Sequence, residues 1–121
     1  MNSLYQRTTG EPGAAVIPLV QTYKATFLNA VVVDTVGTEV VVAAYRTHIF
    51  HIIASGITVG GATVTLESSL NSGTNYAEVY TQDIAANGVI EVRLSGLYDL
   101  LRATVSSRVG GTYSVIYLGG N

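Results

Sequence analysis

Apolar and polar residues alternate along much of the second half of the chain. In the segment GATVTLESS, Ala62, Val64 and Leu66 share one face of an extended strand, and the positions between them are polar. The segments VIEVRL (residues 89–94) and LRATVSS (residues 101–107) alternate in the same way. No segment keeps the 3.6-residue apolar period of a helix. The pattern therefore predicts an all-β chain of half-buried strands, which its 17 Val, 8 Ile and 14 Thr also favour.

Short turn signals separate these strands. They are NSGTN (residues 71–75), the pair Asn87-Gly88 and the pair Gly110-Gly111. Asn and Gly tolerate the left-handed backbone angles of tight turns, so Asn87-Gly88 is the strongest two-residue hairpin signal in the chain. From about residue 58 onward we therefore predict a meander of short antiparallel strands.

The first half contains segments that are apolar on both faces. They are YKATFLNAVVVD (residues 23–34), TEVVVAAY (residues 38–45) and THIFHIIAS (residues 47–55). A strand of this kind needs cover on both sides, from a second sheet or from a second subunit. Seven to nine short strands in about 100 residues fit a single antiparallel β-sandwich over residues 16–121, of jelly-roll or immunoglobulin-like type.

Residues 1–15 show no alternation and contain Gly and Pro. We expect an extended N-terminal arm, with a frayed terminus as the alternative. Leu4 and Tyr5 favour an arm that docks on a partner, because aromatic anchors are enriched in interfaces.

Charged residues are unusually scarce. They make up 12% of the chain, against about 25% in an ordinary soluble domain. The scarcity favours a chain that packs against other subunits, although a neutral β domain with a Thr and Ser surface is the alternative. The net charge of −2 predicts no binding to nucleic acid. The chain also lacks a segment apolar enough for a membrane helix, so no membrane partner is expected.

The sequence contains few residues suited to catalysis. Cys is absent, and His48 and His51 are three apart, so on one strand they point to opposite faces and cannot share a metal ion. Asp34 lies beside a predicted turn, where a carboxylate accepts bonds from backbone N–H groups. Glu67 and Glu91 lie on outward strand faces, where they pair with arginines such as Arg93 or Arg102. We therefore expect no enzyme, no catalytic residue, no metal and no cofactor.

Most aromatic residues of the chain are tyrosines. Tyr113 and Tyr117 share one face of the last predicted strand, where they either cover the edge of the core or form a platform. Such a platform contacts a neighbouring subunit or stacks on a sugar ring. The candidate subunit or shell contacts are Leu4, Tyr5, Val41, Tyr45, Tyr113 and Tyr117.

Residues 58–120 resemble the small β-sandwich structural proteins of tailed bacteriophages. The resemblance rests on a strand ending in LESS, the turn NSGTNY, the segment AANG before a strand, and LSGLYDLLRATVSS before a final hairpin. It implies a capsid decoration (cement) protein that binds the outer surface of the virion shell, after assembly in the host cytoplasm.

The resemblance also implies partners. The first is the major capsid protein. Because contacts of modest area bind weakly unless many copies act together, we also expect a homo-oligomer, with a homotrimer as the expected form, burying one face of residues 31–45 between subunits. A tail, neck or fibre component and a carbohydrate- or receptor-binding module are the alternatives.

Overall fold

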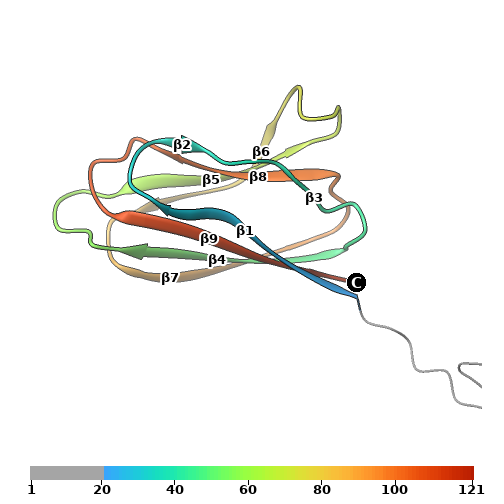
Figure 1. The fold of residues 1–121 in the computed structure, drawn as a ribbon, viewed down its shortest axis with the longest axis horizontal. Coiled ribbons are helices and arrows are strands. Elements are labelled where there is room, and N and C mark those ends of the chain that lie inside the picture. Colours follow the sequence, from blue (N-terminus) through green and yellow to red (C-terminus); the bar gives the residue numbers. More distant parts are fainter. Residues whose placement is uncertain (1–20) are drawn as a thin grey trace, which may run out of the picture.

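The computed structural model describes residues 21–121, which form a two-layered β-sandwich (Figure 1). The predicted arm, with Leu4 and Tyr5, lies outside the described residues. The described part of the chain contains no helix, and so none that could cross a membrane. Its strands are β1 (Thr22–Val31), β2 (Thr35–Val36), β3 (Val40–Val41), β4 (Thr47–Ser55), β5 (Ala62–Ser69), β6 (Ala77–Ile84), β7 (Gly88–Ser95), β8 (Leu100–Ser106) and β9 (Thr112–Gly120).

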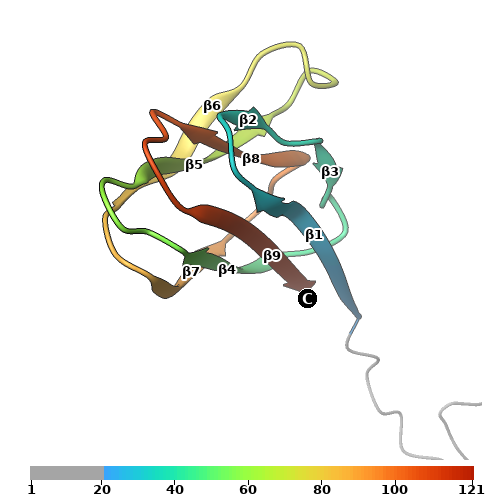
Figure 2. The same ribbon diagram turned by 60° about the vertical axis from the view of Figure 1, so that its left-hand side comes forward.

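The strands form two antiparallel sheets that face each other (Figure 2). Sheet A has the order β1-β9-β4-β7, and sheet B has the order β2-β8-β5-β6. β3 also pairs with β8, so β2 and β3 are two pieces of one interrupted edge strand. Counted in this way, the fold has two sheets of four strands in the order of a jelly roll. The predicted all-β sandwich is confirmed. Of the jelly-roll and immunoglobulin-like topologies that the sequence left open, the strand order is that of the jelly roll.

The predicted meander is wrong. In the described chain only β5 and β6 form a hairpin, around the turn at residues 71–75. Asn87-Gly88 leads from β6 in sheet B to β7 in sheet A, and Gly110-Gly111 leads from β8 in sheet B to β9 in sheet A. A turn sequence specifies a local reversal, whereas the neighbour of each strand depends on pairings far apart in sequence, such as that of β4 with β7.

The core lies between the two sheets. The three alternating residues of β5, Ala62, Val64 and Leu66, are buried as their pattern predicted. Phe27, Phe50 and Tyr117 pack against one another, with ring centroids 5.0–5.3 Å apart. The remaining core side chains are mostly aliphatic: Leu28, Val42, Ile52, Ala54, Ile84, Val92, Leu101, Ala103, Val105 and Val115.

The strand expected over residues 38–45 is largely absent. Gly37 separates β2 from β3 and donates a backbone hydrogen bond to the carbonyl of Ala103 at 2.8 Å. The approach is so close that a Cβ atom on Gly37 would lie 2.6 Å from that carbonyl oxygen. Val36 and Val41 on this interrupted edge are 63% and 66% exposed, because their side chains lie on the outer face of sheet B, which no other strand within residues 21–121 covers.

Candidate functional site

Two of the predicted contact residues are accessible. Val41 lies on β3, and Tyr45 follows it in the connection to β4. The ring of Tyr45 is half-buried and stacks on that of Tyr23 in β1, with the centroids 5.8 Å apart. The structure therefore leaves Val41 and this aromatic pair able to contact a partner.

The interpretation of Tyr113 and Tyr117 as contact residues is wrong. Both side chains are completely buried, because they occupy the inward positions of β9, a central strand of sheet A. The Tyr113 hydroxyl donates to the carbonyl of Gly110 at 2.7 Å. The alternative interpretation assigned these rings to the edge of the core, and the structure places them fully inside it. The platform proposed for a sugar is therefore not at the surface.

The two histidines lie on opposite faces of β4, as their spacing predicted. His48 is fully buried, and its Nε2 atom lies 3.1 Å from the carbonyl oxygen of Gly96. Its Nδ1 atom lies 2.6 Å from the Tyr117 hydroxyl. Burial lowers the pKa of His48, although the bond to Gly96 partly opposes that shift. Both ring nitrogens are thus occupied in the interior, and His48 is part of the core.

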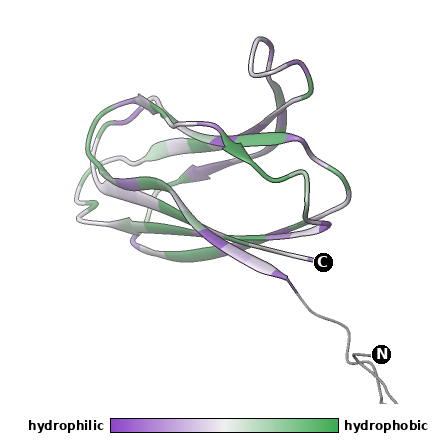
Figure 3. Ribbon diagram, turned by 45° about the vertical axis from the view of Figure 1, so that its right-hand side comes forward, coloured by the Kyte–Doolittle hydropathy of each residue, from purple (hydrophilic) through white to green (hydrophobic). Residues whose placement is uncertain are grey.

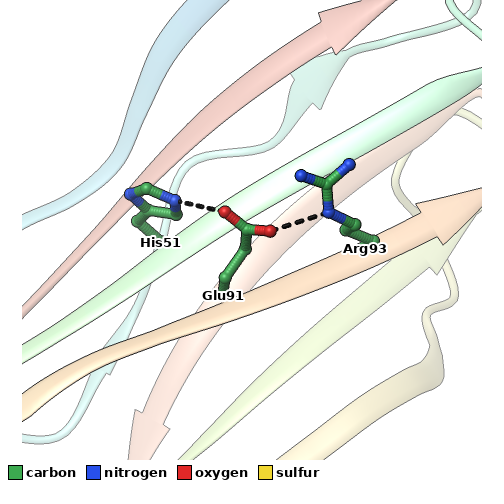
Figure 4. Close-up of polar contacts among 3 residues, drawn as sticks. All are labelled: His51, Glu91 and Arg93. Atoms are coloured by element: carbon green, nitrogen blue, oxygen red, sulfur yellow. Dashed lines mark hydrogen bonds and ion pairs between the residues drawn. The ribbon is translucent and has the colours of Figure 1, made fainter.

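His51 belongs to an ionic cluster on the outer face of sheet A (Figure 4). One carboxylate oxygen of Glu91 lies 2.9 Å from His51 Nε2, and the other accepts from Arg93 Nε at 2.7 Å. The hydrogen bonds from His51 and then from Arg93 lower the pKa of Glu91. All three side chains are well exposed, and residues 21–121 contain no group of three His, Cys, Asp or Glu that could hold a metal ion.

A second ion pair lies on the outer face of sheet B. Glu67 of β5 accepts from Arg102 of β8 at 2.9 Å, which confirms the predicted cross-strand pairing. Thr104 donates to the same carboxylate oxygen at 3.0 Å. The guanidinium carbon of Arg102 lies 3.6 Å from the centre of the Tyr76 ring. Salt bridges and cation–π contacts of this kind order a surface but supply no nucleophile.

Exposed valines lie on the loops at one end of the sandwich, a surface that the alternation of apolar and polar residues did not predict. Val32 and Val33 follow β1, Val59 lies between β4 and β5, and Val109 lies between β8 and β9. They are 51%, 63%, 76% and 69% exposed, respectively. We call these four residues the valine surface; Figure 3 colours parts of this end as hydrophobic. The repeated sequence Val-Gly-Gly at residues 59–61 and 109–111 was the available signal.

Hydrogen bonds tie the loops of the valine surface together. The backbone N–H of Arg108 donates to Asp34 at 2.9 Å, which confirms the predicted role of Asp34 in accepting from a backbone group. The N–H of Val109 donates to the carbonyl of Gly61 at 2.8 Å. These bonds link three loops that are distant in sequence. A surface held in this way loses less conformational freedom when it binds a partner.

Comparisons with known proteins identify the fold. No protein-family model matches the chain, and no curated protein sequence matches it. Among solved structures, the SPBc2 prophage-derived protein YomS is 18% identical, with a TM-score of 0.62 over 89% of this chain and 100% of that chain. A structure described as "Bacillus endospore appendages form a novel family of disulfide-linked pili" is 8% identical, with a TM-score of 0.51 over 88% of this chain and 92% of that chain. At these identities the likeness shows a shared fold.

Proposed function

We propose that this chain is a non-enzymatic structural protein of a tailed bacteriophage, and that it decorates the outer surface of the capsid shell. The observation that carries the proposal is the valine surface, four aliphatic side chains that are more than half exposed on mutually tied loops. Exposed apolar groups gathered in one place are typical of interaction sites. A solved structure of similar fold comes from a prophage-derived protein, which supports a phage origin.

The chemistry of the valine surface indicates the kind of partner. The loops at residues 32–34, 56–61 and 107–111 contain two charged residues, Asp34 and Arg108, of opposite sign. The partner surface is therefore expected to be apolar and nearly uncharged, and binding should depend little on salt. An apolar site on the major capsid protein would meet these conditions.

The area of the valine surface favours binding in many copies. Complete burial of one valine side chain stabilises by about 1.5 kcal/mol or more, whereas association costs roughly 4–15 kcal/mol. A single copy would therefore bind weakly through these four residues alone. Copies that also contact one another would gain affinity through avidity on a repeating shell.

Contacts between copies would not include disulfide bonds. The structural neighbour described as disulfide-linked pili has a linkage that this chain cannot make, because its sequence contains no Cys. Within residues 31–45, the part outside the valine surface, with Val36, Val41 and Tyr45, is the region expected between subunits of the trimer. The trimer itself stays a prediction.

Binding to isolated shells tests the proposal. Shells of the phage that encodes the chain, assembled without it, are mixed with the purified protein and sedimented; the protein should cosediment. The double variant Val59→Asp, Val109→Asp should stay in the supernatant, because both charges would be buried at the contact. Leu70→Asp is the matched control, since Leu70 is 82% exposed on the β5–β6 turn at the opposite end of β5.

Two results would contradict the proposal. Cosedimentation of the double variant at the wild-type level would show that the valine surface does not contact the shell. Failure of the wild-type protein to bind shells, together with its presence in purified tails, would assign it to the tail instead.

A further inference from the structure

β7 differs from the other edge strands of the sandwich. β1 has two register shifts against β9, and β6 has one against β5. The edge formed by β2 and β3 is interrupted and only two residues long in each piece. Bulges and short strands of this kind prevent an edge from pairing with another chain. β7 has neither protection, since it pairs with β4 over eight consecutive residues without a shift.

The unpaired side of β7 presents a regular row of backbone groups. Gly96 N–H donates to the carbonyl of Arg46 at 2.8 Å, in register with the β4–β7 ladder. Because hydrogen-bonded pairs alternate along an antiparallel ladder, the even-numbered residues of β7 bond to β4. The N–H and C=O groups of Val89, Glu91, Arg93 and Ser95 therefore point away from the sheet. In the described chain no other strand pairs with them.

We propose that two copies of this chain pair through β7, antiparallel and about a twofold axis at Val92. The pairing would join two copies of sheet A into one continuous sheet of eight strands. It rests on the proposed function, to which it adds a second contact between copies, separate from residues 31–45, and it uses the edge of sheet A opposite to β1. It therefore leaves the valine surface and the exposed side of residues 31–45 free.

The charges on β7 favour a second copy of this chain as the partner that pairs with its open edge. If Val92 lies opposite Val92 of the second copy, then Glu91 of each copy lies opposite Arg93 of the other copy. Opposite charges directly across an antiparallel pair are stabilising. Arg93 bonds to Glu91 within its own strand through Nε, so the terminal nitrogens of its guanidinium are left to reach the second carboxylate.

The neighbouring registers are unfavourable. A shift of two residues places Glu91 opposite Glu91 or Arg93 opposite Arg93, and like charges across a pair repel. A shift of one residue places inward side chains opposite outward ones. The sequence of β7 thus favours one register of self-pairing.

The inward face of β7 supports the same arrangement. In the proposed register Ile90 of one copy lies opposite Leu94 of the other. Both side chains pack against the core but are only partly buried, as expected at an open edge of the sandwich. A second copy would cover the exposed parts of both side chains.

Charge reversal tests the pairing in the purified protein alone. Light scattering during size exclusion should give an even number of 12.7 kDa chains for the wild type. Arg93→Glu and Glu91→Arg, each placing like charges opposite each other, should raise the dissociation constant of the pair on the order of tenfold or more. The double variant Glu91→Arg, Arg93→Glu should restore pairing, because the charges are complementary again.

The matched control for Glu91→Arg is Glu78→Arg, which makes the same change in net charge on the edge strand β6 and should leave the mass of the oligomer unchanged. In hydrogen exchange, the amides of Glu91 and Arg93 should become protected as protein concentration rises. The amide of Val92, which bonds to β4, should be protected at all concentrations.

Three outcomes would overturn the pairing: a wild-type monomer at millimolar concentration, single variants with the mass of the wild type, or a folded double variant that stays dissociated. An odd-numbered oligomer that charge reversal does not affect would favour the trimer through residues 31–45. Because shell binding is assigned to the valine surface, Arg93→Glu should still bind shells. Its loss of pairing is therefore distinguishable from failure of the proposed function.

Discussion

The Nδ1 atom of His48 and the hydroxyl of Tyr117 lie 2.6 Å apart in the interior of the sandwich. Because Nε2 of the same ring faces the carbonyl oxygen of Gly96, that nitrogen carries the proton and Nδ1 accepts from Tyr117. The arrangement requires a neutral imidazole. A protonated ring would carry a charge in the core and would turn the acceptor at Nδ1 into a donor.

This relationship predicts that acid destabilises the fold. Burial lowers the pKa of His48 below its ordinary value of 6.5, so the unfolded chain takes up a proton more readily than the folded one. The stabilisation is therefore complete above about pH 6.5 and decreases as the pH falls through the lower pKa of the folded state. Urea unfolding between pH 7.5 and 5.0 measures the effect. This pH range lies above the pKa of the exposed Glu91, which is lowered from its ordinary value of 4.5, so Glu91 stays ionised throughout the measurement.

His48→Gln should remove this pH dependence, and His51→Gln is its control. His51 lies on the exposed face of the same strand, so its replacement should leave the acid sensitivity in place. Equal pH profiles for the wild type and for folded His48→Gln would contradict the prediction.

The close approach of Gly37 to β8 predicts that this position tolerates no side chain. Gly37→Ala would place Cβ 2.6 Å from the carbonyl oxygen of Ala103, so the backbone must shift. We expect a loss of about 1–3 kcal/mol in the free energy of unfolding, as for other overpacked sites. Thr38→Ala, at the exposed adjacent residue, should change stability by less than about 0.5 kcal/mol. Similar unfolding midpoints for the two variants would show that the edge strand adapts.

The bond between Asp34 and Arg108 predicts how the loops of the valine surface are held. Asp34→Ala removes the acceptor for the backbone N–H of Arg108 and should cost about 0.5–1.5 kcal/mol of stability. Hydrogen exchange at the Arg108 amide should become faster. Asp34→Asn keeps an oxygen at the same place and should retain most of the protection. If the Asp34→Asn and Asp34→Ala variants lose the same protection at the Arg108 amide, the charge of Asp34 holds the loop and not the position of its oxygen.

Alternation along the strands was enough to predict which side chains of β5, β7 and β8 face inward. It also placed His48 and His51 on opposite faces, and it put Glu67 on the outward face where it meets Arg102. The same pattern could not assign Tyr113 and Tyr117. An aromatic ring on one face of a strand is compatible with the core or with the surface, and the central position of β9 in its sheet decided between them.

Strand period and composition are local properties of the chain, so they were enough to predict a β-sandwich with few charges. The neighbours of each strand could be read from the folded chain alone, since β4 pairs with β7 and β9 across long stretches of sequence. The loops around Asp34, Gly61 and Val109 likewise come together through contacts between distant segments. The valine surface and the open edge of β7 are consequences of those pairings, which no local pattern specifies.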